Sequence, residues 1–272
     1  MSAIILIRGG GDLASGSALR LHLAGLQVVI TELPQPLVVR RLVAFAEAVY
    51  TGQTSVEGVV ARRVDDLHSV QAVLNKGEIA VLVDPEAESR RQFRPLVLID
   101  GRMTKQQPDL GLNVAELVIG LGPGFTAGVD CHAVIETQRG HNLGRVIWQG
   151  SARPDSGIPE SVEGHGDDRI LRSPADGILQ VRAVIGDHLE PGQPVASVSG
   201  QAVTAPFRGV LRGLAYPGLK VQCGVKIGDV DPRDDPSYCH LVSDKSLAVA
   251  GGVFEAILSH PVLRARLWEQ RR

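Results

Sequence analysis

Short apolar runs alternate with longer stretches whose apolar residues recur at helical spacing through the N-terminal half of the chain. The first apolar run leads into glycines and then into a helical stretch that ends near Leu23, with Gly25 as a candidate C-cap. Strands are predicted at residues 5–7, 28–30, 56–61, 79–83, 96–99, 117–121, 129–137 and 146–148. Helices are predicted at residues 38–50, 64–75, 246–258 and 261–269. This alternation favours an α/β fold with a doubly wound, parallel sheet.

The glycine-rich turn after the first strand is the most informative segment. Gly9 and Gly11 take the first two glycine positions of the dinucleotide-binding fingerprint and Ala14 takes the third, with Gly16 expected on the sheet-facing side of the helix. Such a turn lets a phosphate approach the backbone, and the helix N-terminus offers N–H groups to an anion. Glu32 ends the second strand, where the ribose hydroxyls of NAD would bind. The predicted binding residues are Gly9, Gly10, Gly11, Asp12, Leu13, Ala14, Gly16 and Glu32.

This order of strand, glycines, helix and acid predicts a Rossmann-like domain that binds a nucleotide or a dinucleotide. The alternative is a turn of the same kind that has lost its ligand and keeps its glycines for tight packing.

A second glycine-rich loop follows the strand predicted at 117–121, and Gly122 and Gly124 in it are candidates for a second wall of the ligand site. The alternative is a compact turn between two strands. Cys131 lies just beyond this loop and is a weak candidate for a catalytic thiol, with a packed core cysteine as the alternative. Adjacent Cys131 and His132 would point to opposite faces of a strand and so cannot form a catalytic pair. No metal site is predicted, because packed residues explain the Cys-His pairs at 131–132 and 239–240 better.

Residues 173–230 contain an internal repeat with a constant offset of 32 positions, as between Gly177 and Gly209 or between Gly186 and Gly218. Each half predicts short strands joined by turns. The two halves resemble the barrel-sandwich of biotinyl and lipoyl domains, whose carriers bear a modified lysine on the hairpin between the halves. Here that hairpin, residues 198–203, has no lysine. The repeat therefore predicts a small all-β module without biotin or lipoate.

The length of 272 residues favours two domains. The predicted parts are a nucleotide-binding domain at 1–150, a linker at 151–168, the repeat domain at 169–232, and a C-terminal helical segment at 233–272 that packs back on the first domain. A net charge of -2 disfavours nucleic-acid binding. The chain has no apolar run of about 18 residues, no signal-peptide pattern and only three cysteines, so we expect no membrane span and a cytoplasmic location.

Several segments resemble the YqeB family, described as selenium-dependent molybdenum hydroxylase system proteins. The matching segments are residues 7–14, 31–36, 120–125, 134–141, 228–233 and 243–245. The N-terminal part is also similar to the Rossmann domain of XdhC proteins, which help to load and sulfurate the molybdenum cofactor of xanthine dehydrogenases. The resemblance implies an accessory role in maturing a molybdenum hydroxylase. It carries binding roles only to the glycine turns and Glu32, and it carries no catalytic residue.

The leading hypothesis is a maturation factor that binds NAD(P), a molybdopterin dinucleotide or a plain nucleotide, with a molybdenum hydroxylase as its partner. One alternative is an NAD(P)-dependent oxidoreductase. It is disfavoured because the sequence has no Tyr-x-x-x-Lys or comparable proton-transfer pattern. The other alternative is a non-catalytic regulatory or scaffold protein with a vestigial nucleotide site.

Overall fold

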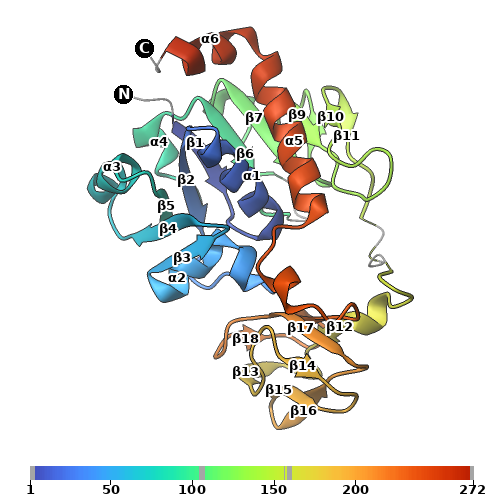
Figure 1. The fold of residues 1–272 in the computed structure, drawn as a ribbon. Helices are drawn as coiled ribbons and strands as arrows, with labels where there is room; N and C mark the ends of the chain where they lie inside the picture. The colour runs from blue at the N-terminus through green and yellow to red at the C-terminus, as the bar shows by residue number, and fades with distance from the viewer. Residues whose placement is uncertain (1–3, 104–107, 156, 158–160, 270–272) are drawn as a thin grey trace. The chain divides into compact units, whose positions relative to one another are not determined.

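The computed structural model describes residues 4–103, 108–155, 157 and 161–269 (Figure 1). The chain forms two compact units. Unit 1 comprises Met1–Pro36, Phe45–Asp155 and Val242–Arg272, and unit 2 comprises Leu37–Ala44 and Ser156–Leu241. Residues 156 and 158–160 of the predicted linker and residues 270–272 of the predicted C-terminal segment lie outside the described residues.

Unit 1 is built on a nine-stranded sheet with the order β10-β9-β7-β6-β1-β2-β5-β4-β3. Its strands are β1 (Ile4–Arg8), β2 (Gln27–Glu32), β3 (Gln53–Val56), β4 (Val59–Val64), β5 (Ile79–Val83), β6 (Val97–Asp100), β7 (Leu117–Leu121), β9 (Ala133–Ile135) and β10 (Val146–Ile147). All neighbours pair in parallel except the terminal pairs β3–β4 and β9–β10. The predicted α/β class with a mainly parallel sheet is therefore confirmed. A separate two-stranded sheet joins β8 (Thr126–Ala127) to β11 (Gly150–Ser151).

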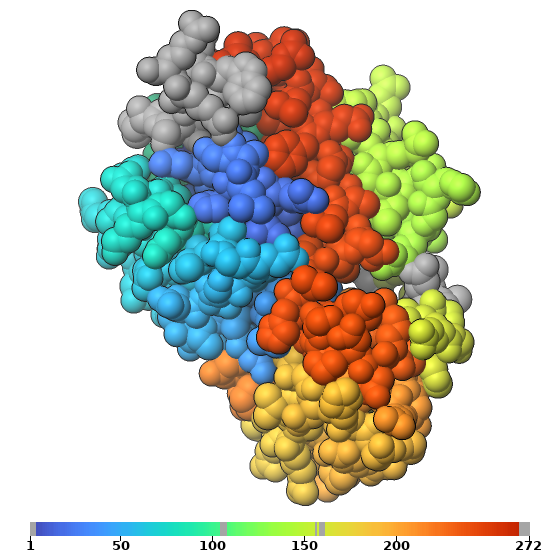
Figure 2. Space-filling view, in the orientation of Figure 1, coloured from blue at the N-terminus to red at the C-terminus, as the bar shows by residue number. Residues whose placement is uncertain are grey.

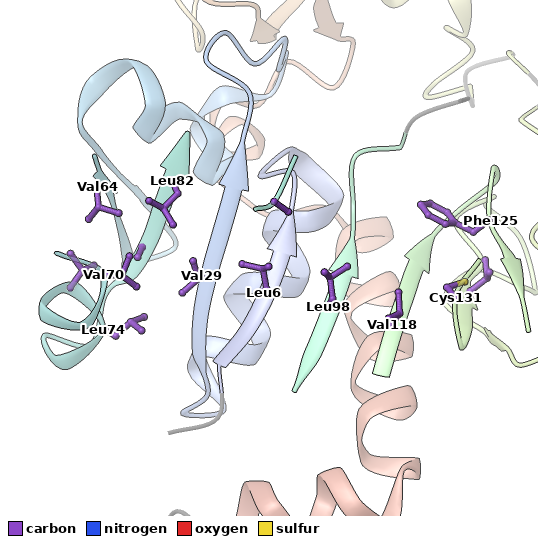
Figure 3. Close-up of a cluster of buried hydrophobic side chains, with 14 of the residues drawn as sticks. Leu6, Val29, Val64, Val70, Leu74, Leu82, Leu98, Val118, Phe125 and Cys131 are labelled. Atoms are coloured by element: carbon purple, nitrogen blue, oxygen red, sulfur yellow. The ribbon is translucent and has the colours of Figure 1, made fainter. Parts of the chain in front are cut away.

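The central strands are largely apolar up to their carboxyl ends and are buried on both faces, as expected of parallel strands covered by helices. On one face, side chains such as Leu6 and Val118 form a continuous layer with Val70 and Leu74 of α3 (Leu67–Asn75), as Figure 3 shows. On the other face, α1 (Asp12–Leu23) and α5 (Asp244–Ser259) lie side by side (Figure 1). The remaining helices of unit 1 are α2 (Ala48–Thr51), α4 (Arg90–Phe93), α6 (Pro261–Glu269) and the 3₁₀ turns at Phe45–Glu47 and Leu112–Val114.

Close backbone approach joins α1 to α5. A Cβ on Gly16 would lie 2.8 Å from the Cβ of Ser246, so Gly16 faces α5 and not the sheet, contrary to the prediction. A Cβ on Gly252 would overlap the carbonyl oxygen of Gly144. Figure 2 shows the resulting surface, on which the red C-terminal segment runs beside the blue N-terminal segment of unit 1.

The helix predicted at 38–50 is wrong over most of its length. The structure has 3₁₀ turns at Arg41–Val43 and Phe45–Glu47, and only α2 is α-helical. The amide of Phe45 donates to Ser15 Oγ (2.8 Å) and the amide of Ala46 donates to the Gly10 carbonyl (2.9 Å). These two amides therefore bond to the glycine turn and to α1, and they are not available for the hydrogen bonds of an α-helix.

Two predicted strands also differ from the structure. The strand expected at 56–61 is a hairpin of β3 and β4, because Glu57 and Gly58 have φ values of 46° and 85° and form its turn. The strand expected at 129–137 is reduced to β9, because Gly128 has a φ of 87° and the chain turns there before Cys131.

Unit 2 contains two four-stranded antiparallel sheets, with the orders β12-β19-β17-β14 and β16-β15-β13-β18. The strands of the first half are β12 (Ile170–Arg172), β13 (Gly177–Val181), β14 (His188–Leu189) and β15 (Pro194–Val198). Those of the second half are β16 (Gln201–Thr204), β17 (Gly209–Leu214), β18 (Lys220–Val221) and β19 (Lys226–Asp231). An offset of 32 residues converts the strand order of one sheet into that of the other, so the sequence repeat is also a structural repeat. Unit 2 also has 3₁₀ turns at Arg41–Val43, Asp167–Arg169 and Pro236–Cys239.

Candidate functional site

The candidate site lies at the carboxyl edge of the sheet, between β1 and β6. The chain runs from β1 to β2, continues to the sheet edge at β3, and returns through β4 to β5. It then crosses to β6, where the other side of the sheet begins. Such a reversal of strand order is where open parallel sheets bind ligands. Arg8 ends β1 beside Asp100, which ends β6, so the loops that follow these residues adjoin each other.

The glycine turn needs its first glycine for two reasons. Gly9 has a φ of 91°, which favours glycine, and a Cβ there would lie 3.2 Å from the backbone of Arg102. Ala14, at the third fingerprint position, is buried against Gly101. The two backbones approach so closely that a Cβ on Gly101 would lie 2.7 Å from the Cβ of Ala14, which leaves no room for a larger side chain. The loop after β6 thus packs directly on the turn and on the first turn of α1.

Gly11 is the open position of this turn. It is the N-cap residue of α1 with an ordinary extended backbone (φ −70°, ψ 179°), and no side-chain hydrogen bond caps the helix there. A Cβ built on Gly11 would meet no atom of the described residues within 4 Å. Leu13, in the first helical turn, is partly exposed, and Asp12 accepts a hydrogen bond from Ser246 Oγ at 2.8 Å. The N-terminus of α1 therefore offers space beside Gly11 for a group that accepts hydrogen bonds.

Glu32 lies at the glycine turn, where the sequence placed it, but its carboxylate binds the main chain. Oε2 accepts a hydrogen bond from the amide of Gly10 (2.6 Å) and Oε1 accepts one from the amide of Leu33 (2.7 Å). Burial raises the pKa of Glu32, and these two hydrogen bonds oppose the rise. Glu32 thus fixes the conformation of the turn, and its contact with a ribose stays a prediction.

A buried charge network beside the turn was missed by the sequence analysis. Arg8 is only 2% exposed and forms a bidentate pair with Asp109, with Nη1–Oδ1 and Nη2–Oδ2 distances of 2.6 and 2.8 Å. Arg102 forms a bidentate pair with Asp100 and also donates to Oδ1 of Asp109 at 2.8 Å. Hydrogen bonds from Arg8 and Arg102 hold the pKa of Asp109 far below its usual range. One signal was available: Arg8 and Asp100 are charged residues that end apolar strands.

The second glycine loop follows β7 at the same sheet edge and packs against its surroundings. Gly122 has a φ of 76°, and a Cβ there would lie 2.5 Å from Oγ1 of Thr137 and 3.1 Å from Cε of Met103. Gly124 has a φ of 103°. The loops after β6 and β7 are therefore in contact, and Gly122 has no open space of the kind found at Gly11.

Cys131 is part of the apolar layer and lies near Phe125 in Figure 3. Its side chain is fully buried, and burial raises the pKa of the thiol to about 11. A reactive cysteine needs a lowered pKa and access to solvent. The environment of Cys131 therefore matches the alternative kept open above, a packed core cysteine. Among the described residues, no group of three or more His, Cys, Asp or Glu side chains could hold a metal ion, and no helix is long and apolar enough to cross a membrane.

No protein-family model matches the chain. The chain is similar to YqeB, an uncharacterized protein of Escherichia coli (strain K12), with 44% identity over 255 residues that cover 94% of this chain and 47% of that protein. The chain thus spans about half the length of this relative, and the resemblance to YqeB is confirmed by the sequence similarity.

Likeness to solved structures is weak. The product-bound ectoine utilization protein EutE (DoeB) of Ruegeria pomeroyi gives 12% identity and a TM-score of 0.29, covering 84% of this chain and 85% of that one. An aspartoacylase family protein of Mesorhizobium loti gives 10% identity and a TM-score of 0.26, covering 84% of each chain. These TM-scores are too low to indicate a shared fold.

Proposed function

We propose that this protein binds a nucleotide-bearing ligand at the glycine turn between β1 and α1. The observation that carries the proposal is the open position at Gly11, which stands at the uncapped N-terminus of α1. Helix N-termini attract anions because their N–H groups lack intrahelical partners and their dipoles are positive at that end. The location between β1 and β6, where the strand order reverses, supports the same proposal.

The ligand classes proposed are NAD(P), a molybdopterin dinucleotide and a plain nucleotide. In each case a phosphate would lie at Gly11 and Leu13. The ribose would approach Glu32, whose two oxygens each retain a lone pair after binding the Gly10 and Leu33 amides. Gly122 and Gly124 would belong to the neighbouring wall formed by the loop after β7.

The biological role proposed is that of an accessory protein in the maturation of a molybdenum hydroxylase. It is supported by the segments shared with the YqeB family, of which the 44% identical Escherichia coli relative is a member. The fold proposed is a Rossmann-like domain for unit 1 and a barrel-sandwich for unit 2. The interchange of the two sheets of unit 2 by the 32-residue offset supports the latter. No biotin or lipoate is expected, because the β15–β16 hairpin has no lysine.

A second candidate, a non-catalytic module with a vestigial nucleotide site, is favoured by one observation. The Gly10 amide and carbonyl are already engaged, by Glu32 and by the amide of Ala46. A ligand phosphate would therefore bind through Gly11 and the first turn of α1 alone, and would have fewer donors than a fully open turn.

Replacement of Gly11 by valine separates the two candidates. The valine side chain fills the space that a phosphate would occupy, and its Cβ meets no atom in the part of the chain that the structure describes. We expect the loss of an N-cap glycine to lower the free energy of unfolding by only about 1 kcal/mol. Isothermal titration calorimetry would compare NAD(H), NADP(H), ATP, GTP, CTP and molybdopterin dinucleotides on wild type and variant, with Gly251→Val on the exposed face of α5 as the control.

The proposed function predicts that at least one of these ligands binds wild type and Gly251→Val equally, and binds Gly11→Val about 100-fold more weakly or not at all. If the wild type binds none of these ligands, the second candidate, a non-catalytic module with a vestigial nucleotide site, is favoured. Equal binding by Gly11→Val would place the ligand elsewhere.

A further inference from the structure

Two guanidinium groups meet beside the glycine turn. Arg8 precedes Gly9 directly, and the backbone of Arg102 lies 3.2 Å from the Cβ position of Gly9. Nη1 of Arg8 and Nη2 of Arg102 both donate to one oxygen, Oδ1 of Asp109, at 2.6 and 2.8 Å. Two cationic groups that share one acceptor atom form a position for an anion.

The anion that occupies this position is the least anchored member of the network. Asp109 has a side chain that is 42% exposed, whereas the side chains of Arg8 and Asp100 are 2% and 3% exposed. It lies in a segment, residues 108–111, that has neither helix nor strand. Three hydrogen bonds from the two arginines hold its carboxylate.

Both arginines keep other partners that would hold them in place without Asp109. Arg102 retains its bidentate pair with Asp100, at 2.9 and 2.7 Å. Arg8 retains two hydrogen bonds to the Pro85 carbonyl, at 3.1 and 2.7 Å. Departure of Asp109 would leave Nη1 of Arg8 and one N–H of Nη2 of Arg102 without an acceptor, while Nη2 of Arg8 would keep Oε2 of the exposed Glu86 at 3.5 Å.

We infer that Asp109 occupies the position of a ligand phosphate, and that binding of the ligand displaces it. A phosphate presents the same pair of oxygens to a guanidinium group as a carboxylate does. The inference rests on the proposed function: while one phosphate binds at Gly11, a second phosphate of the same ligand replaces the Asp109 carboxylate between Arg8 and Arg102. Asp109 then competes with the ligand, and its affinity for the two arginines sets a threshold for binding.

The inference is tested with inorganic pyrophosphate as the probe and with Asp109→Asn. The asparagine keeps the size of the side chain but removes its charge, so its hold on Arg8 and Arg102 weakens and an anion displaces it more readily. We expect calorimetry to give a dissociation constant for pyrophosphate about tenfold lower in Asp109→Asn than in wild type, because the competent fraction of the protein rises. Asp65→Asn, at a carboxylate that is 82% exposed and pairs with Arg63, is the matched control and should bind as wild type does.

Wild type provides a second measurement that does not depend on the variant being folded. Pyrophosphate at saturation should raise amide hydrogen exchange in peptides that cover residues 108–111, because Asp109 is released. Equal pyrophosphate affinity in wild type and folded Asp109→Asn, unchanged exchange in saturated wild type, or no pyrophosphate binding to either protein would each overturn the inference.

These outcomes are distinct from failure of the proposed function. If Asp109→Asn binds pyrophosphate more tightly but no nucleotide binds, the anion position is supported and the proposed nucleotide site is contradicted. If nucleotide binding depends on Gly11 but not on Asp109, the nucleotide site is supported and the displacement of Asp109 is contradicted.

Discussion

Alkylation by iodoacetamide tests whether Cys131 can act as a catalytic thiol. The three cysteines differ in environment: Cys131 and Cys239 are buried, at 0% and 1% exposure, whereas Cys223 is exposed. Iodoacetamide reacts with the thiolate, so the rate at each cysteine follows its ionised fraction and its access to solvent. Cys223 therefore serves as the internal reference in the folded protein.

The size of the expected difference follows from the pKa of Cys131. A thiol with the ordinary pKa of about 8.5 is ionised to about a quarter at pH 8. Burial raises the pKa of Cys131 to about 11, so about one thiol in a thousand is ionised at the same pH. Ionisation alone thus slows Cys131 by about 200-fold relative to an ordinary thiol, and exclusion of the reagent from the apolar layer slows it further.

The assay is a time course of alkylation at pH 8, followed by digestion and peptide mass spectrometry. We expect the Cys223 peptide to be modified first, and the Cys131 and Cys239 peptides to remain unmodified over many half-lives of Cys223. In urea all three should react at similar rates, which controls for reagent quality and peptide detection. Modification of Cys131 in the folded protein at a rate within about tenfold of Cys223 would refute the argument from burial and restore Cys131 as a functional thiol.

Two further predictions concern stability, both measured as the free energy of unfolding in urea. Gly251→Ala should stabilise the protein by about 0.5–1 kcal/mol because the added Cβ meets no described atom. Gly252→Ala should destabilise it by about 1–3 kcal/mol because the added Cβ overlaps the Gly144 carbonyl. Two variants that both stabilise or both destabilise the protein would contradict this reasoning. The lowered pKa of Asp109 contributes stability above about pH 4 that is lost as the pH falls, so the difference between wild type and Asp109→Asn should narrow from pH 5 to pH 3. A difference that stays constant over that range would show that the ion pair adds no stability.

The local parts of the site were predictable, because each depends on neighbouring residues. The order of β1, glycine turn and α1 follows from an apolar run, three glycines and a helical stretch. Glu32 was placed correctly at the turn because it ends the next strand. Its bond to the Gly10 amide was not foreseen, since the sequence pattern does not tell whether a carboxylate faces a ligand or the main chain.

The remaining features depend on residues that are distant in sequence. Asp109 is 101 positions from Arg8, and no spacing rule joins them. The helix expected from residue 38 onward has helical spacing of apolar residues, but hydrogen bonds to Gly10 and Ser15 outweigh that preference. The 32-residue repeat was predictable because the matching residues are visible in the sequence, and the strands of unit 2 recur at the same offset.

The strand orders of unit 2 have a consequence for how this repeat can arise and fold. In each sheet two strands come from one half and two from the other, so neither half contains a complete sheet. A chain cut between β15 and β16 would leave both sheets with missing neighbours. An ancestral single half would have needed a second copy of itself, associated about a two-fold axis, to pair all its strands. Duplication and fusion would then have turned that contact between two chains into a fold within one, and removed its dependence on protein concentration.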